Sequence, residues 1–216
     1  TKEAVAASPT AVRSAAAGPD DDGNTLLHID ADGNTLLHIS AAEGNQESVL
    51  DLIDKGANIG AKNKDEDTPL HLAAMNGHHQ VVLILLDIAK EKGDQYLGEY
   101  LNAKNNNDDT PLQLAIFSRY HSAVNNILDA ADKMNNEEYL KKYLDAVNDD
   151  GDTPLHLASR GGDGVGDGET DEAEEAIVFD ITRLAEKMKD EEYLKEYLNK
   201  VNKDGDTPLH LAAMNG

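Results

Sequence analysis

The sequence has 216 residues, of which 42 are acidic and 19 basic, so its formal net charge is −23. This balance excludes a nucleic-acid-binding protein and argues against docking on anionic membranes, because both need a basic surface. The absence of cysteine excludes disulfides, thiolate zinc sites and cysteine nucleophiles. We therefore expect an intracellular, reducing compartment, the cytoplasm of the source or host cell.

The first 31 residues are expected to form a flexible, partly artefactual leader. Asp22–Ile29 has the same sequence as Asp32–Ile39. Ten residues cannot hold a pair of helices, since one short helix already takes most of that length. The earlier copy is therefore interpreted as a duplication that lies outside the folded array.

One short phrase recurs along the chain. Thr-Pro-Leu-His begins at Thr68, Thr153 and Thr207, and degenerate copies begin at Thr25, Thr35 and Thr110. The spacing from Thr35 to Thr68 is 33 residues, and the later spacings of 42, 43 and 54 are interpreted as the same unit with insertions. A fixed period of this length is typical of a solenoid.

Each unit predicts two short helices. In the second unit Thr68 caps the first helix, Pro69 fits its first turn and Gly77 ends it. A second helix then carries apolar residues from Val81 to Leu86. Neither helix is long enough to be stable alone, so the units are expected to stack.

The motif Asp-Gly-Asp-Thr-Pro-Leu-His-Leu-Ala at Asp150–Ala158 and Asp204–Ala212 resembles the ankyrin-repeat family. The resemblance covers roughly residues 32–216. It implies a mainly α fold, a helix-turn-helix and β-hairpin solenoid of about four repeats and a partial fifth. The approximate repeats are 32–64, 65–106, 107–149, 150–203 and 204–216.

Five positions depart from this pattern, and one of them is Leu36, which replaces proline in the first full copy. Glu66 and Asp108 replace the glycine of the turn, and we expect those two turns to be distorted or less tight. Gln113 replaces the motif histidine, and Arg119 stands where glycine should close the first helix. The resemblance implies that the motif histidines tie adjacent turns together by hydrogen bonds.

A second phrase, Tyr-Leu-x-x-Tyr-Leu, follows three of the second helices, beginning at Tyr96, Tyr139 and Tyr193. This spacing places four large side chains on one face of a helix. It predicts an extra short helix in each long repeat, and the three are expected to stack as an outer, convex layer. Packing is the favoured role of the tyrosines, and a self-assembly surface is the alternative.

Residues 161–172 form a Gly- and Asp-rich insertion. A mobile loop is the favoured interpretation and a calcium site the alternative. The motif histidines lie one repeat apart, too far for shared ligation, so neither a metal nor a cofactor is expected. No nucleophile, phosphate-loop or dinucleotide motif is present, so the chain is predicted not to be an enzyme.

The predicted function is a non-catalytic scaffold that binds a partner protein in a concave groove. By register with the resembled family, the groove is formed by the hairpin tips Asn34, Asp65, Asp67, Asn107, Asp109, Asp150, Asp152, Asp204 and Asp206. It is completed by the inner-helix positions Ala42, Glu43, Met75, Asn76, Phe117, Ser118, Arg160 and Met214. All of these except Ala42, Asp204 and Met214 make up the predicted partner-binding set.

The acidic tips have two explanations. Aspartate is favoured in such turns and improves solubility, or the groove receives a basic segment with Met75, Phe117 and Met214 as apolar contacts. The alternative function is the targeting arm of a larger enzyme or bacterial effector whose active domain lies outside this chain. That alternative rests on the last repeat, which stops after one helix.

Overall fold

The computed structural model describes residues 29–134, 136–160 and 171–215. Residues 1–28 of the leader and residues 161–170 of the predicted loop lie outside this described part, so the predictions made for them stay predictions. Residues 171 and 172 are helical. The described residues form twelve α-helices and contain no strand. The segments between repeats are hydrogen-bonded turns.

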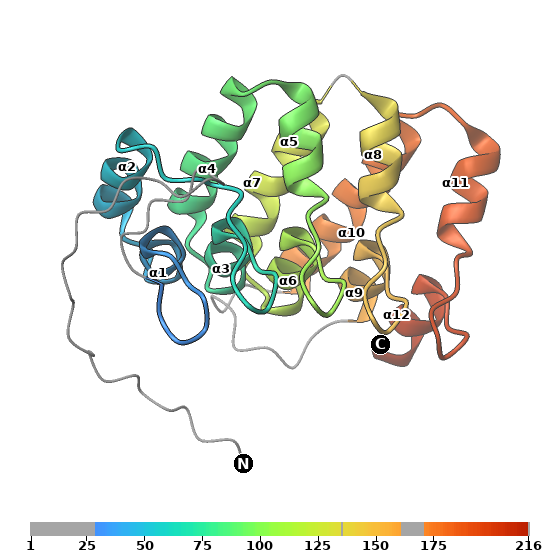
Figure 1. Cartoon of the computed structure of the whole chain (residues 1–216). Helices are drawn as coiled ribbons and strands as arrows, with labels where there is room; N and C mark the ends of the chain where they lie inside the picture. Colours follow the sequence, from blue (N-terminus) through green and yellow to red (C-terminus); the bar gives the residue numbers. More distant parts are fainter. Residues whose placement is uncertain (1–28, 135, 161–170, 216) are drawn as a thin grey trace, which may run out of the picture.

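The helices form a solenoid of stacked layers (Figure 1). The inner layer consists of α1 (Leu36–Ala42), α3 (Pro69–Met75), α6 (Pro111–Phe117), α9 (Pro154–Arg160) and α12 (Pro208–Asn215). The outer layer consists of α2 (Gln46–Asp54), α4 (His79–Glu91), α7 (His121–Asp132) and α10 (Asp171–Glu186). Each of α1, α3, α6 and α9 packs on the next inner helix and on its own outer helix, as the period of the sequence predicts.

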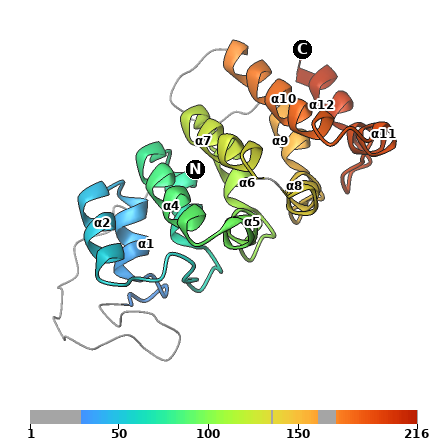
Figure 2. The ribbon, with the colours of Figure 1, turned by 90° about the horizontal axis from the view of Figure 1, so that it is seen from above.

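The predicted third row of helices is present. It consists of α5 (Asp94–Leu101), α8 (Glu137–Leu144) and α11 (Glu191–Leu198). Seen from above, this row runs beside the row of α4, α7 and α10 (Figure 2). The extra helices therefore widen the outer side of the stack.

Packing is the main role of the tyrosines in this row. Tyr100, Tyr143, Tyr193 and Tyr197 are buried in the core. The ring of Tyr139 lies so close to Gly98 that a Cβ there would meet it at 2.6 Å. At the same position of the next helix, Lys141 places its Nζ 4.6 Å from the ring centre of Tyr193. Consecutive Tyr-Leu helices thus contact each other through equivalent positions.

The turns at Glu66 and Asp108 are not distorted, contrary to expectation. Glu66 has φ 62° and Asp108 has φ 59°, in the same left-handed region as Gly33 at 79°. The backbone N–H of Glu66 donates to the Asn63 carbonyl over 3.1 Å, and the N–H of Gly33 donates to Asp30 over the same distance. The turn keeps its geometry, and the cost appears as backbone strain in a non-glycine residue.

We expect Glu66→Gly to raise the free energy of unfolding by about 0.5–1 kcal/mol. Relief of the left-handed backbone is worth about 1 kcal/mol, and loss of the exposed Lys62–Glu66 ion pair offsets part of it. Urea unfolding measures the change. Asp108→Gly should give a smaller gain, because aspartate tolerates this region better. A loss of stability in Glu66→Gly would show that the turn is not strained.

Candidate functional site

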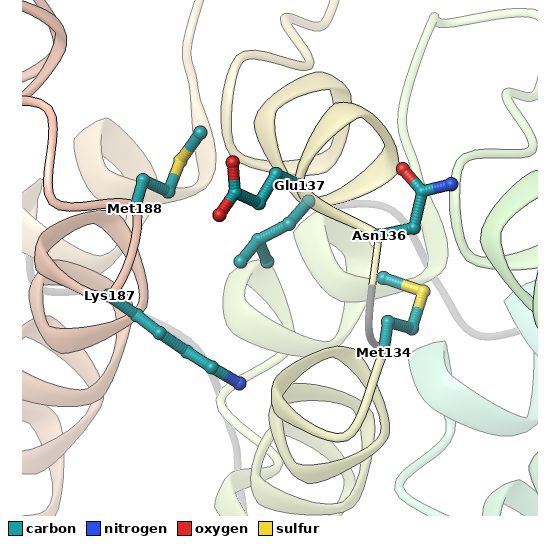
Figure 3. A pocket seen from close by; sticks show the side chains of 6 residues that line it. Met134, Asn136, Glu137, Lys187 and Met188 are labelled. Carbon is teal, nitrogen blue, oxygen red and sulfur yellow. The ribbon is translucent and has the colours of Figure 1, made fainter.

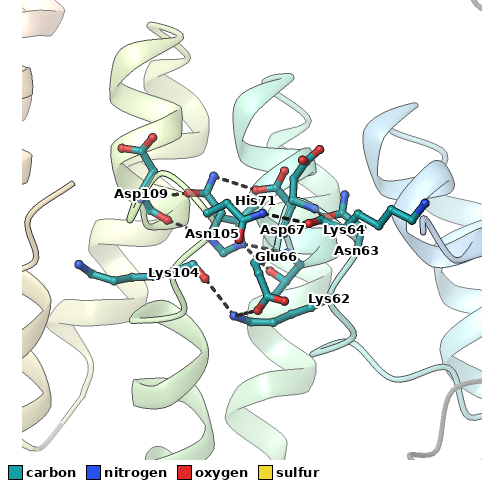
Figure 4. Close-up of polar contacts among 12 residues, drawn as sticks. Lys62, Asn63, Lys64, Glu66, Asp67, His71, Lys104, Asn105 and Asp109 are labelled. Carbon is teal, nitrogen blue, oxygen red and sulfur yellow. Dashed lines mark hydrogen bonds and ion pairs between the residues drawn. The ribbon is translucent and has the colours of Figure 1, made fainter. Parts of the chain in front are cut away.

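The hairpin tips are joined by a row of asparagines five residues before each motif threonine: Asn63, Asn105, Asn148 and Asn202. In the first of these, Oδ1 of Asn63 accepts from the backbone N–H groups of Asp65 and Asp67, which holds its own turn. Its Nδ2 donates to Oδ1 of Asn34 in the preceding turn over 2.8 Å. Asn105 binds Asp67 in the same way over 2.9 Å (Figure 4).

This row occupies part of the predicted binding set. Asn34, Asp67, Asp109 and Asp152 each give a side-chain oxygen to the asparagine of the following turn. Burial raises the pKa of Asp67 and of Asp109, the asparagine hydrogen bonds oppose that rise, and neighbouring aspartates add to it. These side chains therefore hold adjacent repeats together, and they leave a negative field at the tips.

The lysines of the tips bind neighbouring turns. Lys62 donates from Nζ to the Lys104 carbonyl over 3.0 Å and pairs with Glu66 (Figure 4). Lys104 reaches the Val147 carbonyl over 2.6 Å, and Lys64 reaches that of Ala31 over 2.7 Å. Their charges stabilise the stack of turns from one repeat to the next.

A hollow of about 440 Å³ lies between the tips and the inner helices α3, α6 and α9. Its apolar part is formed by Met75, Leu114, Phe117 and Leu157, and Phe117 is 71% exposed. Its polar part is formed by Asn107, Asp109, Ser118, Asn148, Asp149, Asp150 and Arg160. An apolar floor thus lies beside three carboxylates and one guanidinium.

The hollow brings together half of the predicted binding set: Met75, Asn107, Asp109, Phe117, Ser118, Asp150 and Arg160. The other half lies outside its lining: Asn34, Glu43, Asp65, Asp67, Asn76, Asp152 and Asp206. Sequence reasoning missed Leu114, Asn148, Asp149 and Leu157. The two leucines follow the motif at a constant offset, which could have indicated them.

Arg160 and Asp152, both in the predicted set, form an ion pair. Nη2 of Arg160 lies 2.7 Å from Oδ2 of Asp152. The aspartate is fully buried, whereas the arginine side chain is 41% exposed. Oδ1 of Asp152 accepts from Nδ2 of Asn202 over 2.8 Å. Both carboxylate oxygens of Asp152 therefore already accept hydrogen bonds. The groups of this pair that face the hollow are the N–H donors of Arg160.

A smaller hollow of about 190 Å³ lies between α8 and the end of α10. Met134, Asn136, Glu137, Leu140, Lys187 and Met188 line it (Figure 3). Nζ of Lys187 binds the carboxylate of Asp132 over 2.9 Å, so its charge joins α7 to α10. This hollow is a junction between repeats.

The motif histidines tie adjacent turns, as the resemblance implied. In the second repeat, Nδ1 of His71 accepts from the backbone N–H of Thr68 over 3.1 Å. Its Nε2 lies 3.2 Å from the Asp109 carbonyl of the next turn. Gln113 reproduces this pattern: Oε1 accepts from the Thr110 N–H over 3.0 Å and Nε2 donates to the Asp152 carbonyl over 2.8 Å.

Burial lowers the pKa of His71 to about 4, and the hydrogen bond to the Asp109 carbonyl opposes that shift only in part. Burial also lowers the pKa of His38 and of His156. In the described ranges no three or more His, Asp or Glu side chains converge as a metal site. Nor is any helix in that part of the chain long and apolar enough to cross a bilayer.

The paired helices, the Thr-Pro-Leu-His caps and the tied turns define a helical repeat protein. Residues 37–137 match the family model described as ankyrin repeats in three copies. These residues, just under half of the chain, carry ankyrin repeats. A comparison with curated proteins finds no match to the chain. Ankyrin repeats are generally protein–protein interaction modules and typically have no catalytic activity.

Proposed function

We propose that this chain is a non-catalytic scaffold whose hollow between α3, α6 and α9 binds an extended, basic segment of a partner protein. The observation that carries the proposal is the placement of Phe117, 71% exposed, in an apolar floor flanked by Asp109, Asp149 and Asp150. Within this proposal, residues 32–216 act as one array and residues 1–31 as a leader. The cysteine-free sequence is compatible with the proposed reducing compartment.

The floor supplies affinity and the carboxylates supply selectivity. Burying a large apolar side chain is worth about 1.5–3 kcal/mol, so an exposed phenylalanine in a hollow is a favourable contact for a partner side chain. Burial raises the pKa of Asp109, and the neighbouring carboxylates of Asp150 and Asp149 raise it further because like charges repel. A lysine or arginine of the partner would relieve that repulsion and speed association.

Selection of a displayed random-peptide library on the immobilised protein tests this proposal. We expect selected peptides to combine apolar residues with lysine or arginine. Phe117→Ala should weaken their binding at least tenfold. The matched control is Phe179→Ala, because Phe179 is the other phenylalanine of the chain, is 67% exposed and lies on the outer helix α10.

The proposal predicts that the control retains binding within twofold. It also predicts that binding weakens steeply as the salt concentration rises. The proposal would be contradicted if the selected peptides were not enriched in lysine or arginine, or if their affinity did not change with the salt concentration. It would also be contradicted if only Phe179→Ala weakened binding.

A further inference from the structure

One position of the inner helices forms a row along the array. It is the sixth residue after the proline that begins α3, α6, α9 and α12, and it is occupied by Met75, Phe117, Arg160 and Met214. Met75, Phe117 and Met214 are 37%, 71% and 74% exposed. Arg160 is the only charged member of this row, which is otherwise apolar.

The arginine offers hydrogen-bond donors to the hollow. Its pairing with Asp152 uses Nη2, and the carboxylate oxygens of that buried aspartate are both occupied. In the described part of the chain, Arg160 has no second acceptor. Its exposed N–H groups therefore match a carboxylate, whose planar geometry fits a guanidinium well.

The spacing of the row indicates the conformation of its occupant. Neighbouring packed helices lie about 8–10 Å apart. A polyproline II segment has three residues per turn and rises about 9.3 Å per turn, so every third side chain meets the next inner helix. In a β-strand, every third side chain would alternate between opposite faces.

We propose that the groove selects a polyproline-II segment of the partner protein. In this segment the residues at every third position are, in order, apolar, apolar, acidic and apolar, and basic residues stand between them. This inference rests on the proposed function and deepens it. The acidic residue binds Arg160, the apolar residues contact Met75, Phe117 and Met214, and the basic residues face Asp109, Asp149 and Asp150. Because Arg160 is the third of the four residues in the row, the position of the acidic residue determines whether the partner segment runs from α3 towards α12 or from α12 towards α3.

Fluorescence anisotropy with labelled synthetic peptides tests the inference. The parent peptide carries Leu, Leu, Glu and Leu at every third position, with Lys and Pro between, and a second peptide carries the reverse order. Each is compared with versions in which Gln or Lys replaces the Glu. For the preferred direction we expect Glu→Gln to weaken binding about fivefold and Glu→Lys at least tenfold.

The protein side of the test removes the pair without changing net charge. In the double variant Asp152→Asn with Arg160→Met, the preference for Glu over Lys should fall below twofold. The matched control is Asp51→Asn with Lys55→Met, which removes an ion pair of 2.5 Å at the C-terminal end of the outer helix α2 and should keep the tenfold preference. The peptide comparison on the unchanged protein stays decisive even if the double variant fails to fold.

Equal binding of the Glu and Lys peptides, with both weakened by Phe117→Ala, would overturn the inference and leave the proposed function standing. A preference for Glu that persists in the double variant would also overturn it. If none of the synthetic peptides binds, and Phe117→Ala does not change the affinity of the peptides selected from the library, the proposed function itself is wrong.

Discussion

Arg160→Met is expected to lower the free energy of unfolding by about 2–3 kcal/mol. The substitution leaves the carboxylate of Asp152 fully buried and without its cation. Removing one partner of a buried pair costs about 3–5 kcal/mol, and the partial exposure of the arginine reduces that value. Urea unfolding at pH 7 measures the difference.

Adding Asp152→Asn to Arg160→Met should restore stability to within about 1 kcal/mol of the starting protein, because the charge is removed and Asn202 still donates to Oδ1. Position 160 would then be a methionine, as are the equivalent positions of α3 and α12, Met75 and Met214. If the single variant is as stable as the parent, Asp152 does not depend on this ion pair.

His71→Gln is expected to make the protein less sensitive to mild acid. The imidazole has a folded-state pKa of about 4 and an unfolded-state pKa of about 6.5. The unfolded chain therefore binds a proton that the folded chain does not, and stability is lost as the pH falls from about 6.5 towards 4. Between pH 7 and 5 this loss amounts to about 2 kcal/mol.

The physical cause lies in the hydrogen bonds of the ring. Nδ1 accepts from the Thr68 N–H, so a proton on Nδ1 would break that bond while Nε2 faces the Asp109 carbonyl. Glutamine cannot titrate, and Gln113 shows that it fills the same position. Gln113→His should have the opposite effect and steepen the dependence on pH.

Urea unfolding of the parent and His71→Gln at pH 7, 6 and 5 measures this difference directly. The contribution of other titrating groups is common to both proteins and cancels. A difference in unfolding free energy that stays constant across the three pH values would contradict the assignment.

The repeat period, the Thr-Pro dipeptides and the Tyr-Leu phrase were together sufficient to predict the helix pairs, the caps and the third row of helices. Local rules decide these features: threonine caps, proline begins a helix, and four large side chains at Tyr-Leu spacing need a common partner. The role of the motif histidine also followed from the resemblance, and the hydrogen bond from His71 to the next turn confirms it.

The turns at Glu66 and Asp108 were predicted wrongly because residue type was taken to decide conformation. Hydrogen bonds within each turn and to the neighbouring repeat over-determine the backbone, so a non-glycine residue adopts positive φ at a cost. Propensity alone does not contain these long-range contacts.

The predicted groove residues differ in what they can do, and register alone could not separate them. Asp150 lines the hollow, whereas Asp152, two residues later, is buried and paired with Arg160. The distinction depends on side-chain burial between repeats. The periodic asparagines at Asn63, Asn105, Asn148 and Asn202 were the available signal, since each needs an acceptor in the preceding turn.

The central claim is that partners bind between the tips and the inner helices. Backbone amide NMR with an isotopically labelled chain tests it most directly, by adding a selected basic peptide until saturation. We predict that the signals that shift belong to α3, α6, α9 and the turns at 105–109 and 148–152, with the largest change at Phe117. Shifts confined to α5, α8, α11 or the outer helices would contradict the claim.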